Sequence, residues 1–317
     1  MRPPGNAADM ILICGIPSEP PLARVIDALQ RMRTRYTVFN QRHFATAEME
    51  FEIGAGVVSG FITLERNHLP LSRIKAVYTR LMDFRVLPEM RDVADGSAAF
   101  RHCAGLHDTL ARWCEIAPAR VVNRMAPMGS NSSKPYQAQL IQRYGFEVPE
   151  TLITNDAARV LEFRERHKRI IYKSTSGVRS IVQMFADEDV PRLRELKWCP
   201  TQFQQYVEGV DVRVHVVGEQ VFATRVESGA TDYRYASSQV GEAAVLTATE
   251  LSDEIADKCI RLTAGLGLAF AGIDLKLSPD GRVFCFEVNP SPGYSYFEAN
   301  TGQPIARAVA RYLAGKA

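Results

Sequence analysis

The sequence predicts an α/β protein in which an N-terminal α/β domain is followed by α+β lobes. In residues 10–78, short apolar runs alternate with an amphipathic segment, which is the pattern of βαβ units. In residues 210–227, apolar and polar residues alternate, which indicates antiparallel strands with one buried face. The length of 317 residues corresponds to about two domains of roughly 150 residues each.

Composition and charge exclude several classes of protein. Apolar residues make up 46% of the chain and charged residues 23%, as in ordinary globular proteins. The net charge of +2 argues against a nucleic-acid binder. Apolar runs such as 266–273 are far shorter than the ~20 residues of a membrane span, and MRPPGNAAD lacks the apolar core of a signal peptide. We therefore expect a cytoplasmic protein whose partners are neither nucleic acids nor membranes.

Six scattered cysteines without a CxxC pair predict neither a disulfide framework nor a thiolate zinc site.

The N-terminal third predicts strands and helices in alternation. Met10–Ile16 is a short apolar run, and Leu22–Met32 carries apolar residues at helical spacing. Tyr36–Phe39, Gly60–Leu64 and Ala76–Tyr78 are further candidate strands. No GxGxxG follows the first strand and no GxxxxGK[ST] occurs, so a Rossmann dehydrogenase and a P-loop enzyme are both disfavoured.

The middle of the chain contains one candidate phosphate contact. Helices are predicted at about 97–116 and Pro135–Tyr144, and Arg169–Lys173 is a strand that leads into the small-residue loop STSGVRS. Lys173 could reach a phosphate there while backbone N–H groups hold its oxygens. Taken alone, the pattern fits a solvated lysine in a surface loop better.

A predicted hairpin at residues 210–227 carries candidate polar residues on one face. After the short strand Phe203–Val207, the segment VDVRVHVVGEQVFATRVES predicts two strands joined by a Gly218-Glu219 turn of type II′. Pairing Val217 with Gln220 places Asp211, Arg213 and His215 on one face and the valines on the other. The spacing leaves open whether the polar face meets solvent or a ligand.

The strongest chemical signal lies near the C-terminus. AGIDLKL and RVFCFEVNPSPG predict an antiparallel pair joined at SPDG, with Asp274, Glu287 and Asn289 on mainly apolar strands. A buried carboxylate without a partner costs several kcal/mol, and three oxygen donors favour Mg²⁺ over zinc. Ion pairs with nearby arginines are the alternative. A turn of even length places Asp274 on the face of Glu287, whereas a three-residue turn requires a bulge, and the sequence leaves this register open.

The order of these motifs resembles the ATP-grasp ligases, and most of all their RimK-like branch. Lys134 before a helix ending in GFEVP is followed by Lys173, FQQYVEG, VDVRV, DYRYA, AGIDLKL and FEVNPSPG. The resemblance covers about residues 121–317. It implies an ATP-grasp fold with a pre-ATP-grasp α/β domain at 1–120, a central lobe at 121–204, and a C-terminal lobe with the metal site at 205–317.

The resemblance also implies roles for individual residues. Positions that match nucleotide contacts of the family are Lys134 and Lys173 (phosphates), Gln205, Tyr206 and Val207 (adenine), Asp211 (ribose) and Arg234 (nucleotide or acyl phosphate). Positions that match its catalytic arginines are Arg213 and Arg234, and those that match its magnesium ligands are Asp274, Glu287 and Asn289. The stretch from the adenine-contacting hinge segment, Gln205–Val207, to Asp211 is short, so the ribose contact could shift to Glu208. The loop STSGVRS also has fewer glycines than is usual for closure over phosphates.

The implied activity is ATP-dependent ligation through an acyl phosphate. A carboxylate attacks the γ-phosphate of ATP, and an amine or hydroxyl then displaces phosphate, with two Mg²⁺ ions, replaceable by Mn²⁺, as cofactors. One reading is a ligase that forms amide bonds on an amino acid or peptide. A second is a microviridin-type macrocyclase that forms side-chain esters or amides in a precursor peptide. The segments AVYTRLMDFR and PETLITND resemble that group of enzymes. A third is a non-catalytic ATP-binding module.

Further residues are candidates for the substrate side. Arg80 and Arg85 could contact an acidic substrate, and Tyr294, Tyr296 and Glu298 could help to select the acceptor, although structural roles are the more common alternative for such residues. Family members are often dimers or tetramers, so the resemblance also implies a homo-oligomer.

Overall fold

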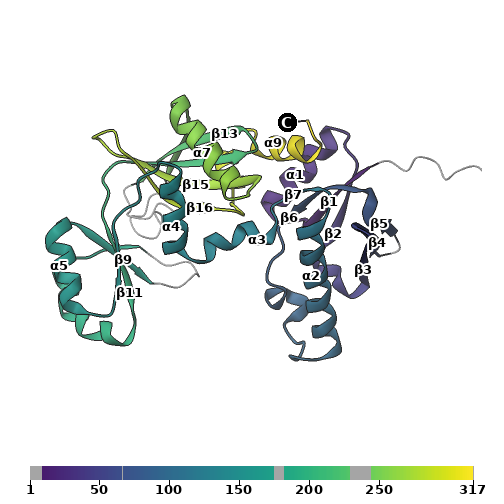
Figure 1. The fold of residues 1–317 in the computed structure, drawn as a ribbon, viewed down its shortest axis with the longest axis horizontal. Helices are drawn as coiled ribbons and strands as arrows, with labels where there is room; N and C mark the ends of the chain where they lie inside the picture. The colour runs from purple at the N-terminus through teal and green to yellow at the C-terminus, as the bar shows by residue number, and fades with distance from the viewer. Residues whose placement is uncertain (1–8, 66, 175–181, 229–243, 317) are drawn as a thin grey trace, which may run out of the picture.

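The computed structural model describes residues 9–65, 67–174, 182–228 and 244–316, which form a mixed α/β structure. Figure 1 shows strands β1 to β7 on one side and the central and C-terminal sheets on the other. Near the C-terminus the chain returns to the first side, where α9 (Ile305–Leu313) lies beside α1 (Pro20–Arg31). The predicted α/β class is confirmed.

The N-terminal sheet is parallel and has the strand order β2-β1-β6-β7. Its strands are β1 (Met10–Gly15), β2 (Tyr36–Asn40), β6 (Ile74–Thr79) and β7 (Arg120–Val122). Helices α1 and α9 share one apolar cluster with the sheet, and α2 (Ala98–Ile116) packs into a second cluster. The predicted βαβ unit is therefore present, because apolar residues at helical spacing bury one face of α1.

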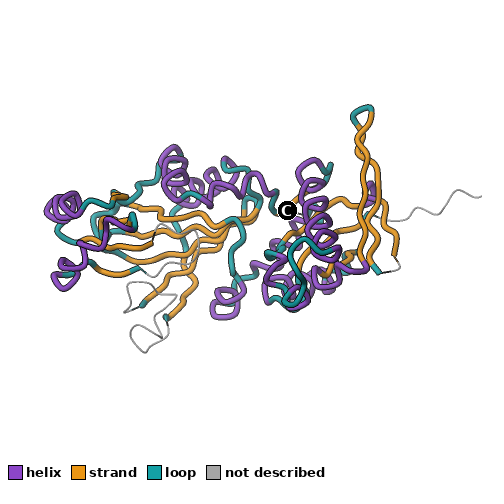
Figure 2. The backbone as a smooth tube through the Cα atoms, turned by 90° about the horizontal axis from the view of Figure 1, so that it is seen from below, coloured by secondary structure: helices purple, strands orange, loops and turns teal. Residues whose placement is uncertain are grey.

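A separate antiparallel sheet follows β2. It consists of β3 (Ala47–Gly54), β4 (Val57–Leu64) and β5 (Asn67–Pro70), and Figure 2 shows the β3–β4 hairpin projecting from the rest of the molecule. The predicted strand Gly60–Leu64 belongs to this sheet and not to the parallel one. Short 3₁₀ helices lie at Gln41–Thr46 between β2 and β3 and at Leu71–Arg73 between β5 and β6. Two more, Phe84–Val86 and Pro88–Met90, lie between β6 and α2.

The central sheet is antiparallel, with the order β10-β9-β11-β8. Its strands are β8 (Thr151–Thr154), β9 (Ile170–Ser174), β10 (Gln183–Met184) and β11 (Thr201–Gln205). Helix α5 (Ala157–His167) and the 3₁₀ segment Asp187–Trp198 pack on it through an apolar cluster. The strand predicted at 203–207 begins and ends two residues earlier, so Tyr206 and Val207 lie just beyond β11.

The C-terminal sheet is antiparallel, with the order β14-β13-β12-β15-β16. Its strands are β12 (Val210–Val217), β13 (Gln220–Glu227), β14 (Val245–Thr249), β15 (Phe270–Leu277) and β16 (Val283–Asn289). Val217 pairs with Gln220 as predicted, and Gly218 in the turn has a φ of +57°. The valine face of β12 packs against α4 (Lys134–Arg143) and α7 (Asp253–Gly265). Further helices among the described residues are α3 (Met125–Met128), the 3₁₀ turn Gly129–Ser132 and α8 (Ser295–Thr301).

A β-bulge determines how the two candidate metal carboxylates meet. The connection between β15 and β16 spans residues 278–282, because Leu277 pairs with Val283. The register shifts between Asp274 and Leu275, so Asp274 pairs with Glu287 although Leu275 pairs with Cys285. The bulge compensates for the odd connection and places Asp274 directly opposite Glu287.

Two expectations about composition can be compared with the described residues. Within them, no helix is both long enough and apolar enough to cross a membrane. All six cysteines are free thiols in the structure, and five of them are buried. Burial raises the pKa of the Cys259 thiol to about 12, so this group stays protonated at neutral pH.

Candidate nucleotide and metal site

A pocket between the central and C-terminal sheets brings most of the predicted site residues together. It is lined by Ile171, Lys173, Val182, Gln204, Gln205, Tyr206, Val207, Asp211, Val212, Arg213, Asp274, Leu275, Lys276, Phe286 and Glu287. Lys134 joins this set through its contact with Glu287, and Asn289 lies two residues further along β16. Arg234 and the loop residues 175–181 lie outside the described part of the chain.

Each candidate metal carboxylate holds a candidate phosphate-binding cation. Asp274 Oδ1 accepts a hydrogen bond of 2.7 Å from Arg213 Nη1, and Glu287 Oε1 accepts one from Lys134 Nζ. Lys134 also donates to Asn131 Oδ1 at 2.8 Å. The sequence left open ion pairs with arginines, and this holds for Asp274, whereas the partner of Glu287 is a lysine. They keep two positive charges beside the pocket.

The donor set nevertheless fits a hard divalent cation. The side chains of Asp274 and Glu287 are 28% and 25% exposed, and their strand positions face each other. Asn289 pairs with Gly272, two positions along the same face of the sheet. Within the described residues no cluster holds three His, Cys, Asp or Glu side chains, so any ion here would rely on two carboxylates and an amide. Mg²⁺ is commonly held by one or two carboxylates, with water and phosphate oxygens completing its shell.

The candidate ribose contact belongs to the pocket wall. Asp211 lines the pocket and lies 3.2 Å from Lys276 Nζ, its cross-strand neighbour. Glu208 does not line the pocket, and its carboxylate lies 3.7 Å from Arg169. The geometry therefore favours Asp211 over Glu208 for a contact inside the pocket.

A buried polar group beside the segment Gln205–Val207 was not predicted from the sequence. Gln204 is only 8% exposed and lines the pocket, and its Nε2 donates to Thr151 Oγ1 at 3.0 Å. Among the described residues its Oε1 has no hydrogen-bond partner, which is a costly state for a buried acceptor. A glutamine at a buried position of a short strand was the available signal.

Gly272 is a second missed position. A Cβ built on it would lie 2.3 Å from Arg213 Nη2 and 2.8 Å from Pro292 Cβ. The arginine and the proline therefore pack directly over the glycine backbone. The signal was a glycine inside an apolar strand, which often marks a close approach.

Two buried amides fix the strand that carries Glu287 and Asn289. Gln137, which is 1% exposed, donates to Val288 O at 2.8 Å and accepts from Val288 N at 3.0 Å. Asn123, which is 3% exposed, donates to Pro290 O at 2.6 Å and Phe270 O at 2.7 Å. These bonds link β16 to α4 and to the segment after β7.

Several candidates for the substrate side have structural contacts instead. The hydroxyl of buried Tyr294 donates to Pro21 O at 2.6 Å, and Glu298 accepts from Ala306 N at 2.8 Å. Arg80 is paired with Glu19, as described below. Of the two remaining candidates, Tyr296 is 49% exposed. Arg85 is also exposed, with its guanidinium 3.3 Å from Asp83.

His215 predicts a pH-dependent effect on stability. Its ring is fully buried, both ring nitrogens lack hydrogen-bond partners among the described residues, and Phe297 packs 5.0 Å away. Burial, with a smaller effect of Arg213, holds the pKa of His215 well below its usual value. Below about pH 6.5 the unfolded chain therefore binds a proton that the folded chain refuses, and stability falls by up to ~1.4 kcal/mol per pH unit until the folded pKa is reached.

We expect His215→Phe to raise the free energy of unfolding by about 1 kcal/mol at pH 7.5, because it removes unsatisfied buried nitrogens. The gain should grow at pH 5.5, where the wild type carries the protonation penalty. Urea unfolding of both proteins at the two pH values measures this. An equal difference in stability at both values would contradict the assignment.

Comparison with known proteins identifies the class to which this fold and site belong. Residues 131–313 match the model of the RimK-like ATP-grasp domain, which is more than half of the chain. The chain therefore belongs to the RimK-like ATP-grasp family. The fold and family expected from the motifs are confirmed.

The curated relatives match only part of this chain. A probable alpha-L-glutamate ligase of Cellvibrio japonicus is 30% identical over 199 residues, which are 59% of this chain and 64% of that protein. The chain thus spans about half to two thirds of the length of the curated relatives it matches.

Solved structures match over nearly the whole chain. The ATP-grasp ligase PsnB, complexed with a phosphomimetic variant of a minimal precursor, Mg and ADP, superposes with a TM-score of 0.76 at 27% identity, covering 98% of this chain and 99% of PsnB. A RiPP-associated ATP-grasp ligase of Chryseobacterium gregarium, in complex with ADP and a leader and core peptide, gives a TM-score of 0.81 at 20% identity and covers 98% and 97% of the two chains. The latter likeness shows the fold alone.

Proposed function

We propose that this chain is an ATP-dependent, ADP-forming ligase that acts on a peptide. It activates a side-chain carboxylate as an acyl phosphate and joins it to a hydroxyl or amine of the same peptide. The observation that carries this proposal is the full-length similarity to PsnB, whose structure contains a precursor, Mg and ADP. The curated glutamate ligases match a smaller share of the chain.

The residues around the pocket suit phosphoryl transfer. Asp274, Glu287 and Asn289 would hold Mg²⁺, which offsets negative charge on phosphate oxygens when bound. Mg²⁺ would then replace Arg213 as the partner of Asp274 and Lys134 as the partner of Glu287. Both cations would become available for phosphate oxygens. Lys173 at the end of β9 supplies a third positive charge.

The hinge suits an adenine ring. Gln205, Tyr206 and Val207 line the pocket at the end of β11. The N–H of Tyr206 donates to Arg169 O at 3.0 Å, so an adenine contact would fall to Val207 or to backbone carbonyls of this segment. The vacant acceptor of Gln204 matches the exocyclic amino group of adenine. We infer that Gln204 contributes to the preference for ATP over GTP.

A second candidate function is ligation of a free amino acid such as glutamate, which the 30% identity to the Cellvibrio japonicus protein favours. The lysines Lys134 and Lys173 and the facing carboxylates of Asp274 and Glu287 support catalysis over a non-catalytic nucleotide-binding module. A homo-oligomer and a cytoplasmic location stay predictions of the sequence.

Product analysis tests the proposal. The protein is incubated with ATP, Mg²⁺ and either pooled amino acids or peptides that carry Asp or Glu together with Thr, Ser or Lys, including any short acidic peptide encoded beside its gene. We expect ADP release with a peptide, and a product lighter by one water for each bond formed. ADP release only with free amino acids, with a heavier ligated product, would contradict it. Glu287→Gln protein controls for contaminating ATPases.

A further inference from the structure

Arg80 joins the N-terminal sheet to the loop after the candidate metal ligands. It follows β6, and its backbone N–H donates to Cys14 O at the end of β1 at 2.8 Å. This point lies between β1 and β6, where the strand order β2-β1-β6-β7 reverses. At such a switch point the carboxyl ends of the strands direct loops toward a ligand crevice.

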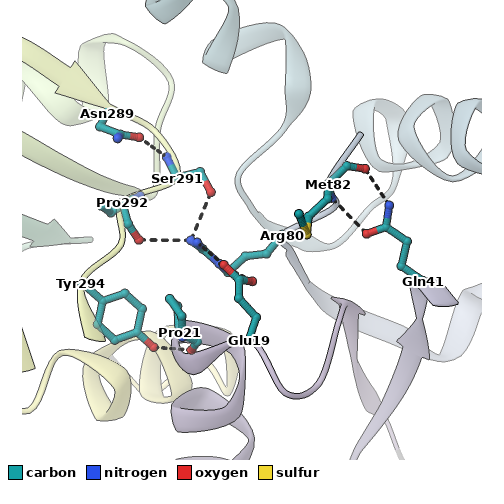
Figure 3. A network of polar contacts seen from close by, with 9 residues as sticks. All are labelled: Glu19, Pro21, Gln41, Arg80, Met82, Asn289, Ser291, Pro292 and Tyr294. Carbon is teal, nitrogen blue, oxygen red and sulfur yellow. Dashed lines mark hydrogen bonds and ion pairs between the residues drawn. The ribbon is translucent and has the colours of Figure 1, made fainter. Parts of the chain in front are cut away.

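The Arg80 guanidinium is fully used within the protein. Its side chain is 9% exposed, and Nη2 and Nε donate to Glu19 at 2.7 Å and 3.1 Å. The remaining nitrogen, Nη1, donates to Ser291 Oγ and to Pro292 O, each at 3.1 Å. Figure 3 shows Arg80 between Glu19 on one side and the Ser291–Pro292 loop on the other.

That loop in turn orients Asn289. The backbone N–H of Ser291 donates to Asn289 Oδ1 at 2.9 Å, which fixes the direction of the amide (Figure 3). Pro292 also packs against Arg213 over Gly272. A shift of the loop would therefore move a candidate metal ligand and the arginine that contacts Asp274.

We propose that Arg80, held by Glu19, is a positioning residue for the metal site, acting through Ser291 and Pro292 on Asn289. This rests on the proposed function, because Asn289 is a ligand only if the pocket binds Mg²⁺ and nucleotide. It replaces the role of direct substrate contact that the sequence suggested. Lysine cannot substitute, because one ammonium lacks the planar fork that serves a carboxylate and a loop together.

Direct metal binding tests the proposal. Mn²⁺ binding in the presence of ADP is measured by electron paramagnetic resonance on the full chain. We expect Arg80→Lys to weaken Mn²⁺ binding by about 10-fold, the lower end of what outer-shell substitutions cost metal sites. Ser291→Ala, which removes one of the two acceptors of Nη1, should weaken it in the same direction by less.

Arg120→Lys is the matched control. Arg120 also joins the N-terminal sheet to the C-terminal part of the chain, through a bond of 3.0 Å from Nη2 to Leu313 O, but it does not contact the ligand loop. We expect it to leave Mn²⁺ binding unchanged even if it lowers the melting temperature as much as Arg80→Lys does.

Two results would overturn the inference in distinguishable ways. If Glu287→Gln abolishes Mn²⁺ binding while Arg80→Lys and Ser291→Ala bind as well as Arg120→Lys, the positioning role is wrong and the metal site stands. If Glu287→Gln binds Mn²⁺ normally, the metal assignment itself fails, and the inference with it. If Arg80→Lys does not fold, the Mn²⁺ binding of Ser291→Ala, compared with that of Arg120→Lys, decides whether the positioning role holds.

Discussion

Glu287→Gln and Asp274→Asn are each expected to reduce Mg²⁺-dependent ATP turnover by at least roughly 10²–10³-fold, the cost of losing one preorganised charge-stabilising group. Each substitution removes a negative charge from the facing pair that the bulge in β15–β16 creates. Both replacements keep the shape and one oxygen acceptor, so Lys134 and Arg213 retain a hydrogen-bond partner. The folded structure should therefore survive, whereas alanine would leave Arg213, whose side chain is 8% exposed, poorly compensated.

ADP release across a Mg²⁺ titration measures this effect, and circular dichroism checks the fold. Asp280→Asn is the matched control, because Asp280 lies in the connection between the same two strands and pairs with Arg282 at 2.8 Å outside the pocket. It should retain full activity. Normal turnover by both site variants would refute the metal assignment.

Gly272→Ala is expected to lower kcat about as far as Arg213→Met does. The new Cβ would lie 2.3 Å from Arg213 Nη2, so the guanidinium must leave its 2.7 Å contact with Asp274. The guanidinium is the end of a flexible side chain, but the ring atom Pro292 Cβ, 2.8 Å from the new Cβ, must shift as well. We therefore also expect the melting temperature to fall by several degrees, which corresponds to about 1–2 kcal/mol.

Gly293→Ala is the matched control for this substitution. Gly293 follows Pro292 directly, and a Cβ there would meet no atom within 4 Å. It should keep both activity and stability. If Gly272→Ala turns over ATP at the wild-type rate, Arg213 does not need its present position, and its catalytic assignment is wrong.

The two C-terminal hairpins show how far local pattern reaches. A two-residue turn and alternating valines were enough to predict the β12–β13 register, because each strand buries one face and a slip would expose it. The β15–β16 register could not be predicted. Its bulge lies where β16 also bonds to a distant segment, with Cys285 N donating to Glu147 O at 2.8 Å.

The sheet β3–β4–β5 was missed although a signal was present. In AEMEFEIG, Met49, Phe51 and Ile53 alternate with glutamates, the pattern of a strand with one apolar face. Gly60–Leu64 was predicted only as a strand, because strand propensity does not reveal which strand will be the partner.

The order of short motifs sufficed for a resemblance that identified the family and the ATP-grasp fold, because each motif is a local stretch of chain. The chemistry of single side chains predicted a set of groups that suits a nucleotide and Mg²⁺. The partner of each charged group depended on the packing of distant segments. Arg213 and Arg80 were both candidate ligand contacts, yet Arg213 lines the pocket while Arg80 binds Glu19 and a loop 211 residues away. Such contacts leave no local pattern, since an ion pair forms wherever folding brings opposite charges together.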